Sequence, residues 1–165
     1  MKTKTINVYQ FDELSDDAKA KAIERLSDIN VDYQWWESTY EDARYVKLKL
    51  TEFDLDRNKH CRGSFMESPT ETAELIVSSH GKDCDTYKTA KAFLSNLNDL
   101  TSPYPNIEDV PEDKIEDLED MFLADLLEDY ASILQKECDY LQSEEAIIET
   151  IKANEYWFTE DGKLE

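Results

Sequence analysis

The chain has 165 residues, which is enough for one domain with a hydrophobic core and too few for two comfortable ones. It carries 39 Asp and Glu against 18 Lys and Arg, a formal net charge of −21. A field of that sign excludes direct binding to nucleic acid or to an anionic membrane surface as the main function, and it favours basic proteins as partners.

The first third predicts a strand, two helices and a hairpin. Residues 3–10 alternate in the manner of a strand, and Ser15 is a good N-cap for a helix that we expect to run to about Asn30. Asp32 is expected to cap a second helix. Over residues 47–56 the apolar residues recur at every second position, which predicts a strand with a bulge near Thr51. A second strand through residues 61–65 completes a hairpin.

The rest of the chain is mainly helical. Ser68 and Pro69 open one helix, and residues 85–100 form another. After a linker at residues 101–106, Pro111 begins a long amphipathic helix that extends to about residue 141. Its expected inward positions are Ile115, Leu118, Phe122, Leu126, Tyr130, Ile133 and Leu134.

A short helix from Ser143 and a strand at residues 156–159 end the chain. The order predicts an α+β fold, in which about six helices cover a small antiparallel sheet of three or four strands. We expect a single domain over residues 1–165, with a mixed portion at 1–66 and a mainly helical, acidic portion at 67–165.

The negative charge is concentrated in the second half, where residues 83–165 hold 6 basic and 23 acidic side chains, a net charge of −17. The segment from Glu108 to Asp129 holds eleven of these acids and only one base, Lys114. Those on the long helix define a candidate partner-binding face: Glu112, Asp113, Glu116, Asp117, Glu119, Asp120, Asp125, Glu128 and Asp129.

Two interpretations of this face stay open. It is either a solvated coat or a surface that imitates a row of phosphates and fills the basic cleft of a nucleic-acid-handling enzyme. Like charges three or four residues apart destabilise a helix, and a solubilising face usually mixes acids with Lys and Arg. The second interpretation predicts a non-catalytic inhibitor whose partner binding weakens with salt.

The sequence offers little catalytic chemistry. Cys61, Cys84, His60 and His80 contain the atoms of a zinc site, but their spacing matches no zinc motif. The acidic stretch that begins at Asp54 lacks the glycine and the final glutamate of a calcium loop. Phosphate-binding, dinucleotide and serine hydrolase motifs are absent, so we expect neither a cofactor nor a bound metal.

Three alternatives remain. Tyr33, Trp35, Trp36 and Tyr40 could form an aromatic interaction surface, or carboxylates could hold a divalent metal in an enzyme such as a nuclease or deacylase. The long helix could also dock against a second copy.

We expect a cytoplasmic protein with reduced thiols. The N-terminus lacks an apolar signal segment, no apolar run is long enough to span a bilayer, and the three cysteines are scattered.

Four segments resemble a family of small proteins encoded by phages and prophages: Tyr9–Lys19 (YQFDELSDDAK), Trp35–Glu37 (WWE), Tyr40–Ala43 (YEDA) and Phe53–Arg57 (FDLDR). The closing Phe158–Gly162 (FTEDG) extends the likeness. The resemblance implies a bacterial cytoplasm and an accessory role during infection. Small acidic phage proteins include inhibitors of host defence, of the anti-CRISPR and antirestriction types, and some of these mimic DNA. The resemblance provides no site residues.

Overall fold

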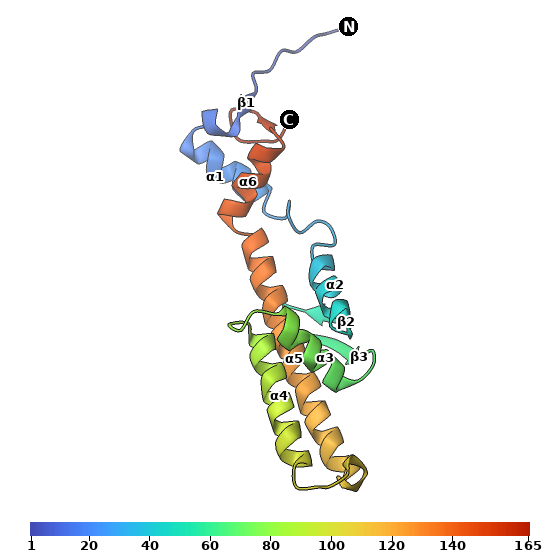
Figure 1. Ribbon diagram of the computed structural model, residues 1–165. Helices are drawn as coiled ribbons and strands as arrows, with labels where there is room; N and C mark the ends of the chain where they lie inside the picture. The colour runs from blue at the N-terminus through green and yellow to red at the C-terminus, as the bar shows by residue number, and fades with distance from the viewer. The chain divides into compact units, whose positions relative to one another are not determined.

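The computed structural model describes residues 1–165, with six α-helices, two short 3₁₀ helices and four strands (Figure 1). The strands form two separate antiparallel pairs, β1 with β4 and β2 with β3. The predicted α+β class is confirmed. No helix combines the length and the apolar character needed to cross a bilayer.

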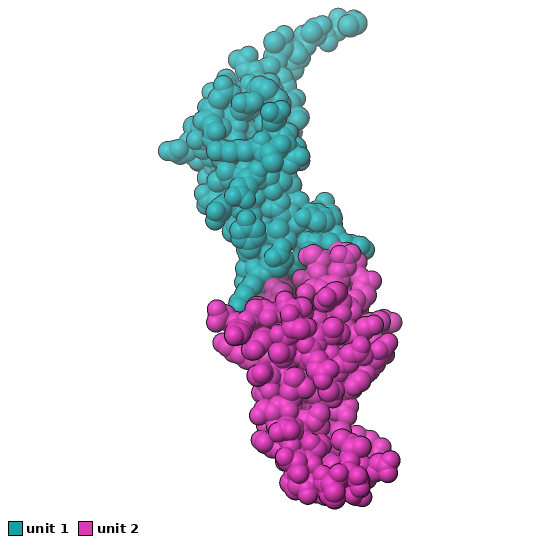
Figure 2. All heavy atoms as spheres, viewed as in Figure 1, with its two compact units in different colours: residues 1–35, 136–165 teal, residues 36–135 magenta.

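The chain divides into two compact units (Figure 2). Unit 1 comprises residues 1–35 and 136–165, and unit 2 comprises residues 36–135. Whether residues 1–165 behave as one domain stays a prediction, because the division shows compactness and not how either unit folds. The unit borders do not coincide with the expected change of character after residue 66.

Unit 1 joins the two ends of the chain. It contains β1 (Tyr9–Gln10), the 3₁₀ helix η1 (Phe11–Glu13), α1 (Asp16–Arg25), α6 (Glu144–Ala153) and β4 (Trp157–Phe158). The predicted caps are confirmed: Ser15 Oγ accepts from the Ala18 amide at 3.2 Å, and Ser143 Oγ accepts from the Ala146 amide at 3.3 Å. Each serine satisfies an amide that has no partner within its helix.

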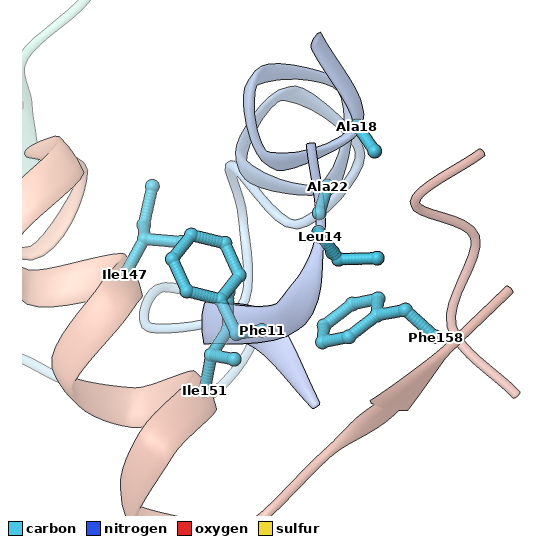
Figure 3. Close-up of a cluster of buried hydrophobic side chains, with 7 residues drawn as sticks. All are labelled: Phe11, Leu14, Ala18, Ala22, Ile147, Ile151 and Phe158. Carbon is cyan, nitrogen blue, oxygen red and sulfur yellow. The ribbon is translucent and has the colours of Figure 1, made fainter. Parts of the chain in front are cut away.

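The core of unit 1 gathers side chains from both ends of the chain (Figure 3). Phe11 and Phe158 meet edge to face, with ring centroids 6.3 Å apart. The alanines of α1 let the remaining side chains approach that helix closely. The cluster comprises Phe11, Leu14, Ala18, Ala22, Ile147, Ile151 and Phe158.

A buried polar contact closes unit 1. Asn30, 6% exposed, donates from Nδ2 to the Leu141 carbonyl at 3.0 Å and accepts from Thr150 Oγ1 at 2.6 Å. Because both groups of its amide are satisfied, the burial of Asn30 costs little. The loop that follows α1 is thereby fixed to the end of α5 and to α6.

Three details of the first third were predicted wrongly. Residues 3–8 form no strand, because β4 offers partners only to Tyr9 and Gln10. Helix α1 ends at Arg25, and turns follow it to residue 31. Asp32 caps no helix: α2 (Glu37–Tyr45) begins later, with Trp36 at the N-cap position.

Unit 2 contains the hairpin β2 (Leu48–Asp54) and β3 (His60–Phe65), together with α2, α3 (Pro69–Ser79), α4 (Asp85–Thr101) and the short η2 (Ile107–Asp109). The predicted bulge lies between Leu50 and Glu52. Helix α5 (Glu112–Leu141) supplies most of its length to this unit and its last residues, from Lys136, to unit 1.

Helix α5 runs beside α4 in the opposite direction (Figure 1). Its buried side chains recur every four residues at Phe122, Leu126, Tyr130 and Leu134. These four predicted core positions are confirmed. Ile133 is 37% exposed instead of buried, and Ala131 takes an inward place that was not predicted.

The turn after β4 requires a glycine at residue 162. Gly162 has φ of 79°, and a Cβ there would collide with the Ala18 carbonyl oxygen of α1. We therefore expect Gly162→Ala to lower the free energy of unfolding by about 2 kcal/mol or more, measured by urea denaturation.

Gly81→Ala is the matched control. The nearest atom to a Cβ at Gly81 is Cys84 Sγ, at 3.6 Å, so there is room for a methyl group. This variant is expected to be neutral or more stable by up to about 1 kcal/mol. Equal losses for the two variants would contradict the assignment of strain to Gly162.

Candidate functional site

The candidate site is the acidic surface of α5. Pro111 precedes the helix, and Glu112 and Asp113 occupy its first turn, where carboxylates stabilise the positive end of the helix dipole. Six of the nine predicted residues lie in the first part of the helix, at residues 112–120, and Glu128 lies further along on its outward side. All seven are exposed except Glu119, which is half-buried. We call this set the acidic face: Glu112, Asp113, Glu116, Asp117, Glu119, Asp120 and Glu128.

None of the seven carboxylates forms an ion pair within the chain. Their mutual repulsion is visible at Glu119, where partial burial and then the charges of Glu116 and Asp120 raise the pKa. Lys114, the one base in this stretch, does not pair with any of them. The acidic face is therefore a surface of uncompensated negative charge.

The other two predicted residues have different surroundings. Asp129 is half-buried and accepts a hydrogen bond from Thr89 Oγ1 of α4 at 2.6 Å. Burial, only partly offset by this hydrogen bond, raises its pKa. Asp125 is exposed and lies at the edge of a groove beside α4. Asp129 therefore contributes to the packing of α4 on α5, whereas Asp125 has no hydrogen bond or ion pair within the chain and is the more accessible of the two.

That groove was not predicted. It lies between α4 and α5, has a volume of about 290 Å³, and exposes the side chain of Met121. Its lining residues are Lys88, Thr89, Ala92, Phe93, Asn96, Leu118, Met121, Phe122 and Asp125. One signal for it is visible in the sequence, an apolar Met121 among the acids of the outward side, but the groove itself depends on how two helices pack.

The histidines and cysteines have separate roles. Cys61 is buried and donates from Sγ to the Leu127 carbonyl at 2.9 Å, and burial raises its pKa to about 11. Nδ1 of His60 lies 2.6 Å from the Asn58 carbonyl oxygen in the hairpin turn, and Cys84 is exposed. No group of three or more His, Cys, Asp and Glu side chains in residues 1–165 is arranged to hold a metal ion.

His80 belongs to a polar cluster that joins four helices. Its Nδ1 lies 2.7 Å from Thr86 Oγ1, and its Nε2 lies 3.5 Å from Oδ2 of Asp42. Tyr130 donates from its hydroxyl to the same Asp42 oxygen at 2.9 Å. Asp42 thus connects α2 to the end of α3 and to α5, while Thr86 is fully enclosed at the start of α4.

The aromatic residues of the alternative surface are partly used in packing. Trp36 and Tyr40 meet Phe53 edge to face, with ring centroids 5.5 Å and 6.2 Å apart. Trp35 is half-buried, and Tyr33, at 60%, is the most exposed of the four. An exposed aromatic surface would therefore depend mainly on Tyr33.

Comparisons of the chain with protein-family models, with curated proteins and with solved structures found no match. The resemblance to phage and prophage proteins consequently stays an expectation. Any functional conclusion has to come from the geometry and charge of the chain itself.

Removal of one repulsive charge is expected to stabilise the protein. Glu116 has acidic neighbours three or four residues away on both sides: Glu112, Asp113, Glu119 and Asp120. Glu116→Gln should raise the free energy of unfolding by about 0.5–1 kcal/mol at low salt, and the gain should shrink at high salt.

Glu24→Gln on α1 is the control, because Lys21 three residues before Glu24 offsets Asp28 four residues after it, so neutralisation should change the stability little. Urea denaturation at two salt concentrations measures both variants. A loss of stability in Glu116→Gln would contradict the absence of a compensating partner.

The Asp42 cluster predicts a dependence of stability on acid pH. The His80 imidazole, with Nε2 3.5 Å from Oδ2, and then the hydrogen bond donated by Tyr130 lower the pKa of Asp42 below its ordinary value of 3.8, although partial burial acts in the opposite direction. Because the folded pKa is the lower one, the stabilisation is present above about pH 4 and is lost as the pH falls through the folded pKa.

Asp42→Asn should therefore lower the free energy of unfolding by roughly 1 kcal/mol at neutral pH, a modest figure because the carboxylate is half-exposed. The difference from the native chain should diminish on acidification below pH 4. Urea denaturation across this range measures it, and a difference that stays constant with pH would contradict the assignment.

Proposed function

We propose that the chain is a non-catalytic inhibitor that binds a basic nucleic-acid-handling protein through the acidic face of α5. One observation carries the proposal: the first six carboxylates of that face, at residues 112–120, have no basic partner in the chain. Such a surface repels nucleic acid and attracts proteins that bind it.

The spacing of these charges supports mimicry of a nucleic acid. Residues 112–120 span about 12 Å of helix, which gives one carboxylate per about 2 Å. Duplex DNA carries one phosphate charge per about 1.7 Å of its axis. A basic cleft shaped for phosphates would therefore meet a similar charge density, held on a helix.

The proposal also fits the self-repulsion of the acidic face. Like charges three or four residues apart lower the stability of the helix. A surface that mixed acidic with basic residues would avoid this loss. A function that requires the field explains why the chain retains it. Together with the phage-like segments, this supports an accessory role in a bacterial cytoplasm, directed at a defence nuclease of the CRISPR or restriction type.

The test is retention of proteins from a bacterial lysate on the immobilised chain, washed with rising salt and then with duplex DNA. We expect nucleic-acid-binding proteins to be held at low salt and released by moderate salt or by DNA, since both compete for the same charges. The captured enzyme should also lose activity on its nucleic acid when the chain is added.

Two triple variants with the same change of net charge distinguish the effect of the acidic face on binding from the effect of the overall charge. The triple variant Glu116→Lys, Asp117→Lys and Asp120→Lys should lose retention and inhibition. Glu24→Lys, Asp28→Lys and Glu74→Lys alter exposed acids elsewhere and should keep both. Inhibition that survives reversal of the acidic face, in a variant whose circular dichroism is unchanged, would refute the proposal.

A further inference from the structure

The groove between α4 and α5 has a rigid aromatic floor. Phe93 and Phe122 stack with ring centroids 4.3 Å apart and planes 5° from parallel, and Phe65 also stacks on Phe122, with ring centroids 5.4 Å apart. Phe93 and Phe122 are 4% and 2% exposed, so they are fixed by the core. The groove is therefore a preformed feature of unit 2 and needs no ordering when a partner arrives.

The walls of the groove are apolar and accessible. Met121 is 60% exposed on the α5 side, and Ala92 is exposed on the α4 side. A volume of about 290 Å³ is near the lower limit of small-molecule sites. It suits one or two aliphatic side chains better than a cofactor, and Met adapts its shape to different occupants.

The α5 rim of the groove is acidic. Asp117 and Asp125 lie four residues before and after Met121, one helical turn to each side of it, and both are exposed. Glu128, seven residues beyond Met121, continues the same side of the helix. The α4 rim carries Lys88 and the polar Thr89 and Asn96, so the one carboxylate among the lining residues, Asp125, comes from α5.

We infer that the groove receives an apolar side chain from a basic segment of a partner protein, while the arginines or lysines beside that side chain contact Asp117, Asp125 and the acidic face. This inference rests on the proposed function and names the chemistry of its partner: a basic segment with an apolar anchor. Charge complementarity favours this occupant over a second copy of the chain, which carries the same negative charge of −21.

The anchor would add affinity that charge does not provide. Exposed charge pairs mainly speed association and weaken in salt, whereas a side chain in a desolvated pocket contributes most of the binding energy of an interface. Nucleic acid, whose contacts are made through phosphates, sugars and base edges, has no comparable apolar groove to receive such a side chain. The groove would therefore let a protein partner be bound more tightly than phosphate mimicry alone allows.

The test uses two synthetic peptides of glycine, serine and arginine with equal numbers of arginines, one with a central leucine and one with alanine in its place. Calorimetry on the full chain should show the leucine peptide binding about tenfold more tightly. The chain has three methionines, Met1, Met66 and Met121. In a ¹³C-methyl spectrum, the leucine peptide should move the Met121 signal and leave the other two in place.

Ala92→Glu and Met121→Gln change the groove at exposed positions that the core does not need. Each should abolish the preference for leucine, although the first adds a negative charge and should bind the alanine peptide at least as well as the native chain. Reversal of Glu116, Asp117 and Asp120 to lysine should weaken both peptides.

The outcomes separate the two proposals. Equal binding of the two peptides, weakened by charge reversal, would overturn the anchor and leave the acidic face in place. Binding of neither peptide, or binding that charge reversal does not weaken, would count against the proposed function as well. A leucine preference that survives both groove variants would place the anchor elsewhere and refute the inference.

Discussion

The buried stripe of α5 is the interaction on which unit 2 depends. Phe122, Leu126, Tyr130 and Leu134 face inward, and contacts to them or to their neighbours come from the hairpin, α2 and α4. Because one side of the helix provides this packing, the opposite side contributes nothing to the hydrophobic core. The unpaired carboxylates occupy that opposite side, so the core and the candidate site are two faces of one element.

The four-residue spacing of the stripe also explains which residues the site includes. Four residues advance about 40° beyond one full turn, so the buried stripe winds around the helix as it proceeds. The outward side winds with it. Glu112 to Asp120 are outward near the start of α5, whereas Asp129, later on the helix, has reached α4 and bonds to Thr89. A list of acids along one helix therefore contains residues in different surroundings.

Local signals in the sequence were sufficient for much of the fold. Ser15 and Ser143 predicted the starts of their helices, because an N-cap is a contact between residues close in the sequence. The bulge after Leu50 was visible as an interruption in the alternation of apolar and polar residues. The errors arose where the structure of a residue depends on contacts with segments distant in the sequence. Residues 3–8 alternate like a strand but lack a partner, and Ile133 lies off the winding stripe.

The same distinction applies to the candidate site. The acids of α5 could be named from the sequence, since charge and helical spacing are local properties. The loss of Asp129 to the Thr89 contact, the aromatic floor formed by Phe93 and Phe122, and the joining of Asp42 to His80 all require knowledge of which helices are neighbours. None of these could be obtained from periodicity.

The pairing of β1 with β4 has a consequence for biosynthesis. Unit 1 takes its core from Phe11 and Leu14 at one end of the chain and from Ile151 and Phe158 at the other, whereas unit 2 is a single continuous segment. Units of structure generally form as they leave the ribosome, and contacts between distant residues form slowly. On the nascent chain, unit 2 can be complete while residues 1–35 still await their partners at residues 136–165, so a segment translated before unit 2 completes its fold after it.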